Sequence, residues 1–309
     1  MKKVMLILAA ACMTAAANAK ILRVSNVSGS SAPYSSIEAA HDAASSGDTI
    51  MLDVSNIRYG TNTTTLTKRL VIIGAGYWLR ENGIVDEGMG SSKVQLFHVK
   101  AEGTVIKGIE LDALYIEAPK VIVNRCKIGS TGIGLEKGSD NCVISQNFIS
   151  GALTSRGGSS VRTNFIQITN NIFSFTSTGA SSFGGFANSH IAYNTFRTSQ
   201  LYVGGTNNST FENNIVQTIK DVNDGSNSYA NNYETNIIHT QATNDFIDKD
   251  YYALEIPADV VSKYGAFAGD SPYVLAGVPS GPVIQDLVVP TTVEMGSKLN
   301  VTVKIGMVK

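Results

Sequence analysis

Two glutamates are the residues of this sequence best placed to do acid–base chemistry. Glu117 and Glu136 each follow an apolar residue that strand alternation points inward, so both carboxylates should face outward. If the separation between them is one repeat of the fold, stacked strands would bring the two carboxylates within roughly 5 Å. Such a pair raises the pKa of one carboxyl and can serve as acid and base, or bind a cation such as Ca²⁺. The alternative is two solvated glutamates paired with Lys120 or Lys137.

A second candidate is the acidic stretch KDVNDGSNS, which contains Asp221, Asn223 and Asp224. Its spacing is similar to part of a calcium-binding loop shifted in phase, but no Glu stands at the twelfth position. A turn rich in Asn, Asp and Gly is the more ordinary interpretation. His190 is a further candidate, either as a general base or as an exposed, solvated side chain.

The sequence lacks the catalytic motifs that identify many enzymes. It contains no Gly-x-Ser-x-Gly elbow, no phosphate-binding loop and no His-Glu-x-x-His. Trp78, Tyr115, Tyr193 and Tyr202 could stack on sugars, although aromatic residues in a repeat protein more often pack between repeats.

A short pattern of apolar, polar and Asn residues recurs along the chain and must position these side chains. One column of the pattern holds Cys126, Asn147, Asn171, Asn194, Asn214 and Asn232, which follow one another at an irregular but similar spacing. Apolar columns lie three residues earlier, at Val123, Ile144, Ile168, Ile191 and Phe211, and two residues later, at Ile128, Ile149, Phe173, Phe196 and Val216. An irregular period of roughly 20 residues without helical periodicity predicts a parallel β-solenoid.

The repeat therefore predicts an all-β fold, a single-stranded parallel β-helix of roughly nine coils. Coils stacked at roughly 4.8 Å would align the apolar columns into a narrow core. The inward Asn column would form a ladder of amides. Cys126 shares that column, so we expect a buried thiol. Cys142 is out of register with it, and we expect no disulfide.

Both ends of the solenoid should be covered. Ser35 with Glu38 makes a capping box for a short helix that would close the first coil. Residues 239–280 read as an irregular segment closing the far end. Alternating residues around Gly296 within 290–305 predict a small β-hairpin. The predicted domains are thus the β-helix over 20–280 and a short hairpin or tail over 281–309.

Residues 1–19 read as a signal peptide. Two lysines precede an apolar run, and an Ala-x-Ala site ends at Ala19, which predicts cleavage before Lys20. The apolar run is too short to span a bilayer. A lipoprotein acylated at Cys12 is the alternative, although Ala9 stands where Leu or Val is usual. We expect an exported protein, either secreted, periplasmic or attached to the outer surface.

The charge balance offers no argument for nucleic acid as a partner. The formal net charge is −1, and removing two lysines with the signal peptide changes it to −3. Only 16% of the residues are charged, which fits a surface of polar strands and turns rather than of helices.

The stretches SSIEAAHDAASSGDTIML and LVIIGAGYWL, the repeated NN-I-F coils and SPYVLAGVPSGPVI resemble the pectin-lyase-like right-handed parallel β-helix superfamily. The resemblance covers most of 21–280 and implies a right-handed solenoid. It also implies that acidic calcium ligands could work with an Arg or Lys base, and Arg156 and Arg162 follow Glu136 in SRGGSSVRTN. The paired Asp with Gly-His-Gly of the superfamily's polygalacturonase-like hydrolases is absent.

Two functions are consistent with these observations. The first is a monomeric, non-catalytic surface or periplasmic protein that binds a polysaccharide or surface glycan, or acts as an adhesin. The second is a lyase or glycoside hydrolase of an acidic polysaccharide, with Glu117, Glu136, Arg156 and Arg162 as catalytic candidates and Ca²⁺ as a possible cofactor. A scaffold selected only for its length and polar surface is a third interpretation.

Overall fold

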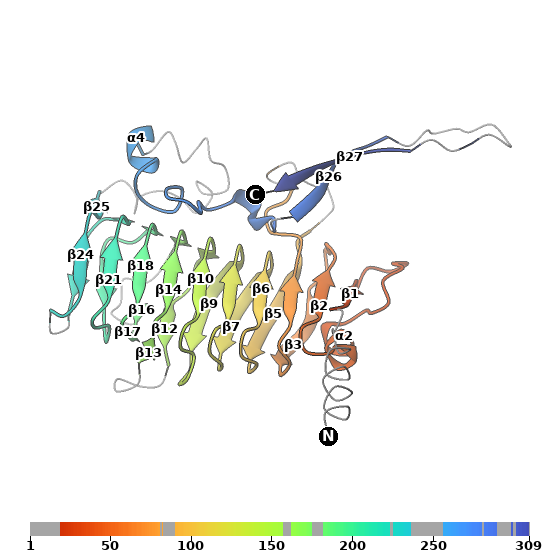
Figure 1. Cartoon of the computed structure of the whole chain (residues 1–309), viewed down its shortest axis with the longest axis horizontal. Helices are drawn as coiled ribbons and strands as arrows, with labels where there is room; N and C mark the ends of the chain where they lie inside the picture. Colours follow the sequence, from red (N-terminus) through yellow and green to blue (C-terminus); the bar gives the residue numbers. More distant parts are fainter. Residues whose placement is uncertain are drawn as a thin grey trace, which may run out of the picture.

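The computed structural model describes residues 19–80, 82, 90–156, 162–174, 182–222, 225–235, 256–279, 281–288, 298 and 301–308. Residues 1–18 of the expected signal peptide, Cys12 included, lie outside this set, as do Asn223 and Asp224. The described chain winds into a parallel β-solenoid of about eight turns, close to the roughly nine expected (Figure 1). No helix in this part of the chain is long and apolar enough to cross a membrane.

One strand of nearly every coil joins a ten-stranded parallel sheet, called sheet 1 here. Its strands are β1 (Ile21–Val24), β2 (Thr49–Leu52), β4 (Val71–Ile73), β6 (Val105–Lys107), β8 (Ile122–Asn124), β10 (Val143–Ser145), β14 (Gln167–Thr169), β18 (His190–Ala192), β21 (Thr210–Glu212) and β24 (Ser228–Ala230). The middle residue of each three-residue strand from β8 to β21 is fully buried. The register pairs Val123 with Ile144, Ile144 with Ile168 and Ile168 with Ile191, as the first apolar column predicted.

Sheet 2 follows sheet 1 in each coil after a tight turn. Its strands are β3 (Tyr59–Leu66), β5 (Lys93–Val99), β7 (Glu110–Ile116), β9 (Lys127–Leu135), β11 (Phe148–Ile149), β12 (Leu153–Ser155), β15 (Ile172–Phe173), β16 (Phe183–Gly184), β19 (Thr195–Phe196), β22 (Ile215–Val216) and β25 (Tyr233–Glu234). Two short pairs complete the later coils: β13 (Thr163–Asn164) with β17 (Phe186–Ala187), and β20 (Leu201–Val203) with β23 (Ile219–Asp221). The first four strands of sheet 2 are the longest, so the widest sheet surface lies in the early coils.

The predicted Asn column forms a continuous hydrogen-bonded spine at the turn between the sheets. The amide Nδ2 of Asn171 donates to Oδ1 of Asn194 at 3.0 Å and to the carbonyl of Ile144 at 2.8 Å. The backbone N–H of Asn171 donates to the same Oδ1 at 3.0 Å. The preceding residue, Asn170, has a positive φ of 56°, which gives the chain its sharp turn. The spine thus satisfies buried backbone groups that the turn would leave unpaired.

Both cysteines of the described chain are buried and free. Cys126 stands first in the spine, and its backbone N–H donates to Oδ1 of Asn147 at 2.8 Å. Burial raises the pKa of the Cys126 thiol to about 12 and that of Cys142 to about 11. The expectations of a buried thiol and no disulfide are confirmed.

A short helix, α2 (Ile37–Ala43), covers the first coil as expected, but its cap differs from the prediction. The hydroxyl of Ser36, not Ser35, accepts the N–H of Ala39 at 3.2 Å. Glu38 does not close a capping box, because its carboxylate accepts the Thr64 hydroxyl at 2.6 Å across the coil.

Residues 239–255 of the segment that was expected to close the far end lie outside the described set, and residues 256–279, called the strap here, do not cover that end. The strap contains helix α4 (Ala258–Val261) and the 3-10 turn η2 (Leu275–Gly277) and runs back along the turns of the spine (Figure 1). Side chains that directly precede spine Asn residues bind the strap: Nδ2 of Asn170 donates to the Ala268 carbonyl at 2.7 Å, and Nε2 of Gln146 to the Pro272 carbonyl at 2.6 Å. Burial of a second apolar cluster, which includes Phe148 and Tyr273, holds the strap in place.

The chain continues into an antiparallel pair, β26 (Gly281–Val288) and β27 (Thr302–Val308). β27 overlaps the end of the 290–305 stretch in which the hairpin was expected and β26 precedes that stretch, so the predicted β element is present with different bounds. Gly296 lies outside the described residues.

Candidate functional site

The outward side chains of sheet 2 in the early coils form a charged face. Its members are Lys93, His98, Lys100, Glu110, Tyr115, Glu117, Lys127, Glu136 and Arg156, carried by or directly following β5, β7, β9 and β12. The N–H of Glu117 donates to Val99, and that of Glu136 to Ile116, both at 2.8 Å. The two glutamates therefore occupy one column in consecutive coils.

The two carboxylates have partners in different coils: those of Glu117 lie in the preceding coil, and that of Glu136 lies in the following one. Glu117 accepts a hydrogen bond from Nδ1 of His98, and its other oxygen lies 3.4 Å from Nζ of Lys100. Glu136 Oε1 lies 3.7 Å from Nε of Arg156. The hydrogen bond from His98, followed by the contact with Lys100, lowers the pKa of Glu117 below its ordinary value. Glu117 is thereby held ionised, whereas a carboxylate pair would raise one pKa.

Arg156 packs over an aromatic ring of this face. Its guanidinium carbon lies 4.4 Å from the centroid of the Tyr115 ring, within cation–π range. His98 meets the same ring edge-on at 4.9 Å. Gly134 leaves the room that Arg156 occupies, because a Cβ there would overlap its side chain.

Arg162 is not brought to this group. It precedes β13, and its Nε donates to the carbonyl of Gly205 at 2.6 Å. Lys120, an expected partner of the glutamates, pairs instead with Glu102 at 2.7 Å. The constellation anticipated from the sequence thus contains Glu117, Glu136 and Arg156 without Arg162.

Glu110 is the centre of a second charged group at the other side of the face. Its carboxylate accepts Lys127 Nζ at 2.8 Å and the Ser91 hydroxyl at 2.7 Å. Burial raises the pKa of Glu110, but Lys127, the hydrogen bond from Ser91 and the charge of Lys93 together outweigh it, and the net pKa is lowered. Lys127 also lies 5.2 Å from the centroid of the Trp78 ring. These side chains line a groove of about 300 Å³.

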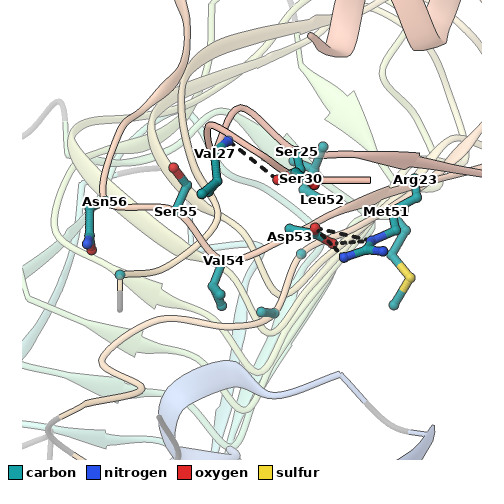
Figure 2. A pocket seen from close by; sticks show the side chains of 13 residues that line it. Arg23, Ser25, Val27, Ser30, Met51, Leu52, Asp53, Val54, Ser55 and Asn56 are labelled. Carbon is teal, nitrogen blue, oxygen red and sulfur yellow. Dashed lines mark hydrogen bonds and ion pairs between the residues drawn. The ribbon is translucent and has the colours of Figure 1, made fainter. Parts of the chain in front are cut away.

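A larger cleft of about 620 Å³ adjoins this groove, and the two share Asn56 and Gly90 in their linings. Figure 2 shows the cleft, with Arg23 and Asp53 joined at one end and Asn56 at the other. Arg23 Nη2 donates to Asp53 Oδ2 at 2.8 Å, and Nε to Oδ1 at 2.9 Å. The cleft lies where β1, β2 and β4 end, on the edge of the solenoid that the strap covers in later coils.

The remaining candidates are engaged in ordinary contacts. His190 Nε2 lies 2.7 Å from Oε1 of Glu212 on the outer face of sheet 1. Asp221 accepts the hydroxyl of Tyr229 at 2.6 Å. Within the described ranges, no group of three or more His, Cys, Asp or Glu residues could hold a metal ion; the rest of the expected calcium loop lies outside them.

The aromatic residues proposed to stack on sugars are also in contact with other groups. Lys220 lies over the Tyr202 ring at 5.0 Å, and Gly269 of the strap packs on Tyr193. Tyr115 and Trp78 face Arg156 and Lys127. Each of the four rings thus has a neighbouring group within the protein.

Sequence reasoning missed His98 and Lys100, although a signal was available. His98 precedes Glu117 by the same spacing that relates Glu117 to Glu136. Counting that spacing back from Glu117 would have pointed to His98, whereas the register pairs His98 with Tyr115 and places Lys100 in the column of the glutamates. Comparison of the chain with protein-family models, curated proteins and solved structures gave no match.

Proposed function

We propose that this chain is an exported β-solenoid protein that binds a polysaccharide or surface glycan without catalysis, through the charged face of sheet 2. The observation that carries the proposal is that each carboxylate of this face is paired with a positively charged side chain. Glu117, Glu136 and Glu110 each contact a cation, and the pKa values of Glu117 and Glu110 are lowered. A general acid needs a pKa near the working pH, so this arrangement favours binding over proton transfer.

The chemistry of the face suits a polyhydroxylated polymer. Its ion pairs offer donors and acceptors side by side, which is what sugar hydroxyl groups require. The coils repeat at roughly 4.8 Å, so a long ligand can meet equivalent groups in successive coils. The resemblance to the pectin-lyase-like superfamily, in which many members act on polysaccharides, agrees with this class of ligand.

The test is retention of the mature chain, from Lys20 onward, on a panel of acidic and neutral polysaccharides, with calcium and with a chelator. We expect retention without unsaturated products or new reducing ends. The double variant His98→Ala/Glu117→Gln should weaken retention at least fivefold. The matched control is His190→Ala/Glu212→Gln, which removes a similar pair from sheet 1. Equal effects of the two variants, or no retention of the wild type, would refute the proposal.

One observation favours a second candidate, a lyase or hydrolase of an acidic polysaccharide. The hydrogen bond between His98 and Glu117 lies next to Glu136 and Arg156 on the same face, and such a dyad could remove a proton. Under this alternative, Glu117→Gln or Glu136→Gln should abolish turnover of a polysaccharide in the panel, with calcium required if a metal assists. Under the first proposal there is no turnover to abolish.

A further inference from the structure

The cleft of Figure 2 is a second surface feature that the charged face does not explain. It is enclosed by the chain after β1, the turn after β2 and the residues that follow β4. Its volume of about 620 Å³ is within the range of roughly 300–1,000 Å³ typical of small-molecule sites. That is room for a short oligosaccharide and too little for a folded partner.

The polar end of the cleft is built from one ion pair. Arg23 and Asp53 are joined by a forked set of hydrogen bonds, with Nε also 3.1 Å from Oδ2. The side chain of Arg23 is 50% exposed and that of Asp53 is 22% exposed, so both can still reach a ligand. A guanidinium has five N–H donors and a carboxylate about four acceptor sites, more than the pair itself uses. Adjacent donors and acceptors match two neighbouring hydroxyl groups, since each hydroxyl donates one hydrogen bond and accepts others.

The formal charges of the cleft cancel. Arg23 and Asp53 are the charged residues of its described lining, and the other side chains are hydroxyl, amide or apolar. An acidic sugar would gain from Arg23 and lose to Asp53. The cleft therefore favours a neutral ligand.

Apolar side chains form the rest of the wall. Val27 is 48% exposed and Met51 is 46% exposed, and both line the cleft. In the described chain, four of the eight exposed large apolar residues, namely Ile21, Val27, Met51 and Ile57, lie in this first part of the solenoid. Apolar groups beside a fixed polar pair match the C–H face and the hydroxyl edge of a pyranose ring.

We propose that the cleft binds a neutral sugar unit that carries vicinal hydroxyl groups, with Arg23 and Asp53 holding the hydroxyls and Met51 and Val27 packing on the ring. The inference rests on the proposed glycan-binding function and names the ligand class of a distinct subsite. The groove that shares Asn56 and Gly90 connects this subsite to the charged face, so one polymer could occupy both.

The experiment is calorimetric titration of the mature chain with short neutral oligosaccharides of gluco, manno, galacto and xylo type, and with an oligogalacturonate of matched length. We expect at least one neutral series to bind, and Arg23→Gln and Asp53→Asn each to weaken that binding at least tenfold. The matched control is Arg58→Gln, which removes an exposed Arg–Asp pair, Arg58 with Asp112 at 2.9 Å, that is not part of the cleft lining. Thermal unfolding and circular dichroism verify that each variant is folded.

The outcomes separate this inference from the proposed function. If the wild type is retained on a polysaccharide but Arg23→Gln and Asp53→Asn bind the oligosaccharides like the wild type, the cleft proposal is overturned and the function stands. Tighter binding of the oligogalacturonate than of every neutral series also overturns it. Absence of binding to all polysaccharides and oligosaccharides refutes both proposals.

Discussion

Replacement of Asn194 by Ala tests whether the spine holds the coils together. Oδ1 of Asn194 accepts both the N–H and the Nδ2 of Asn171 at 3.0 Å. Its own Nδ2 donates to the carbonyls of Ile168 and Ala192, at 2.8 and 3.0 Å, and to Oδ1 of Asn214 at 3.1 Å. Alanine would leave the buried N–H of Asn171 and the carbonyl of Ile168 without these partners.

Each buried group left unsatisfied costs about 1–3 kcal/mol, so Asn194→Ala should lower the free energy of unfolding by about 3–5 kcal/mol. Urea unfolding followed by circular dichroism measures the loss. Hydrogen exchange at the Asn171 amide tests whether it arises locally, since repeat proteins can open coil by coil. The control is Thr169→Ala, an outward and partly exposed position, which should change stability by no more than about 0.5 kcal/mol. A loss for Asn194→Ala no larger than for Thr169→Ala would show that the amide ladder does not stabilise the fold.

Three further variants test other contacts. The pKa of Glu117 is lowered in the folded state, so its stabilising contribution is present above the ordinary carboxyl pKa and is lost as pH falls through the folded value. Glu117→Gln should therefore lower the free energy of unfolding by less than about 1 kcal/mol near neutral pH and not at all in acid. Urea titrations in which wild type and variant differ by the same amount at both pH values would contradict this. Gly132→Ala would place a Cβ against the Ala152 backbone at a φ of +83°, whereas Gly138 has a φ of +94° and open space around it. We expect the free energy of unfolding to fall by about 3 kcal/mol or more for Gly132→Ala and by about 1 kcal/mol for Gly138→Ala. Equal shifts of the two variants in thermal unfolding would count against the packing argument. Asn170→Ala should loosen the strap by about 1–3 kcal/mol, visible as faster hydrogen exchange within 266–268, and unchanged exchange there would mean that its carbonyl contacts do not hold the strap.

The solenoid itself was predictable because its period is written in the buried residues. The column from Asn147 to Asn232 and the apolar columns beside it recur at a similar though irregular spacing, and each inward position stacks on its equivalent in the next coil. Features that depend on one residue were harder to predict. The spacing to Glu38 favoured Ser35 as the cap, but in the structure Ser36 caps the helix and Glu38 instead accepts the Thr64 hydroxyl, a contact across the coil that local spacing does not show.

The strap was not predictable because it has no repeat of its own. The side chains that bind it, Gln146 and Asn170 among them, read as ordinary polar turn residues in the sequence. The candidate site was only partly predictable. The period places Glu117 and Glu136 in one column, but the partner of each carboxylate comes from a neighbouring coil. For Glu117 that partner is His98, which donates a hydrogen bond to its carboxylate.

The strap also limits the number of coils that could be added to this protein. Its Ala276 carbonyl accepts the N–H of Tyr77 in the coil of β4, and its Gly265 N–H donates to Asn213 in the coil of β21, both at 2.8 Å. Six steps of sheet 1 separate those coils, a span of about 29 Å at the spacing of paired strands. The segment from Gly265 to Ala276 can reach at most about 36–40 Å when fully extended. The spine would accept one more coil, but two more would require about 38 Å and would stretch the strap to its limit. The length of the strap therefore sets an upper limit on the number of coils. A duplication of more than two coils between β4 and β21 must be matched by an insertion within the strap.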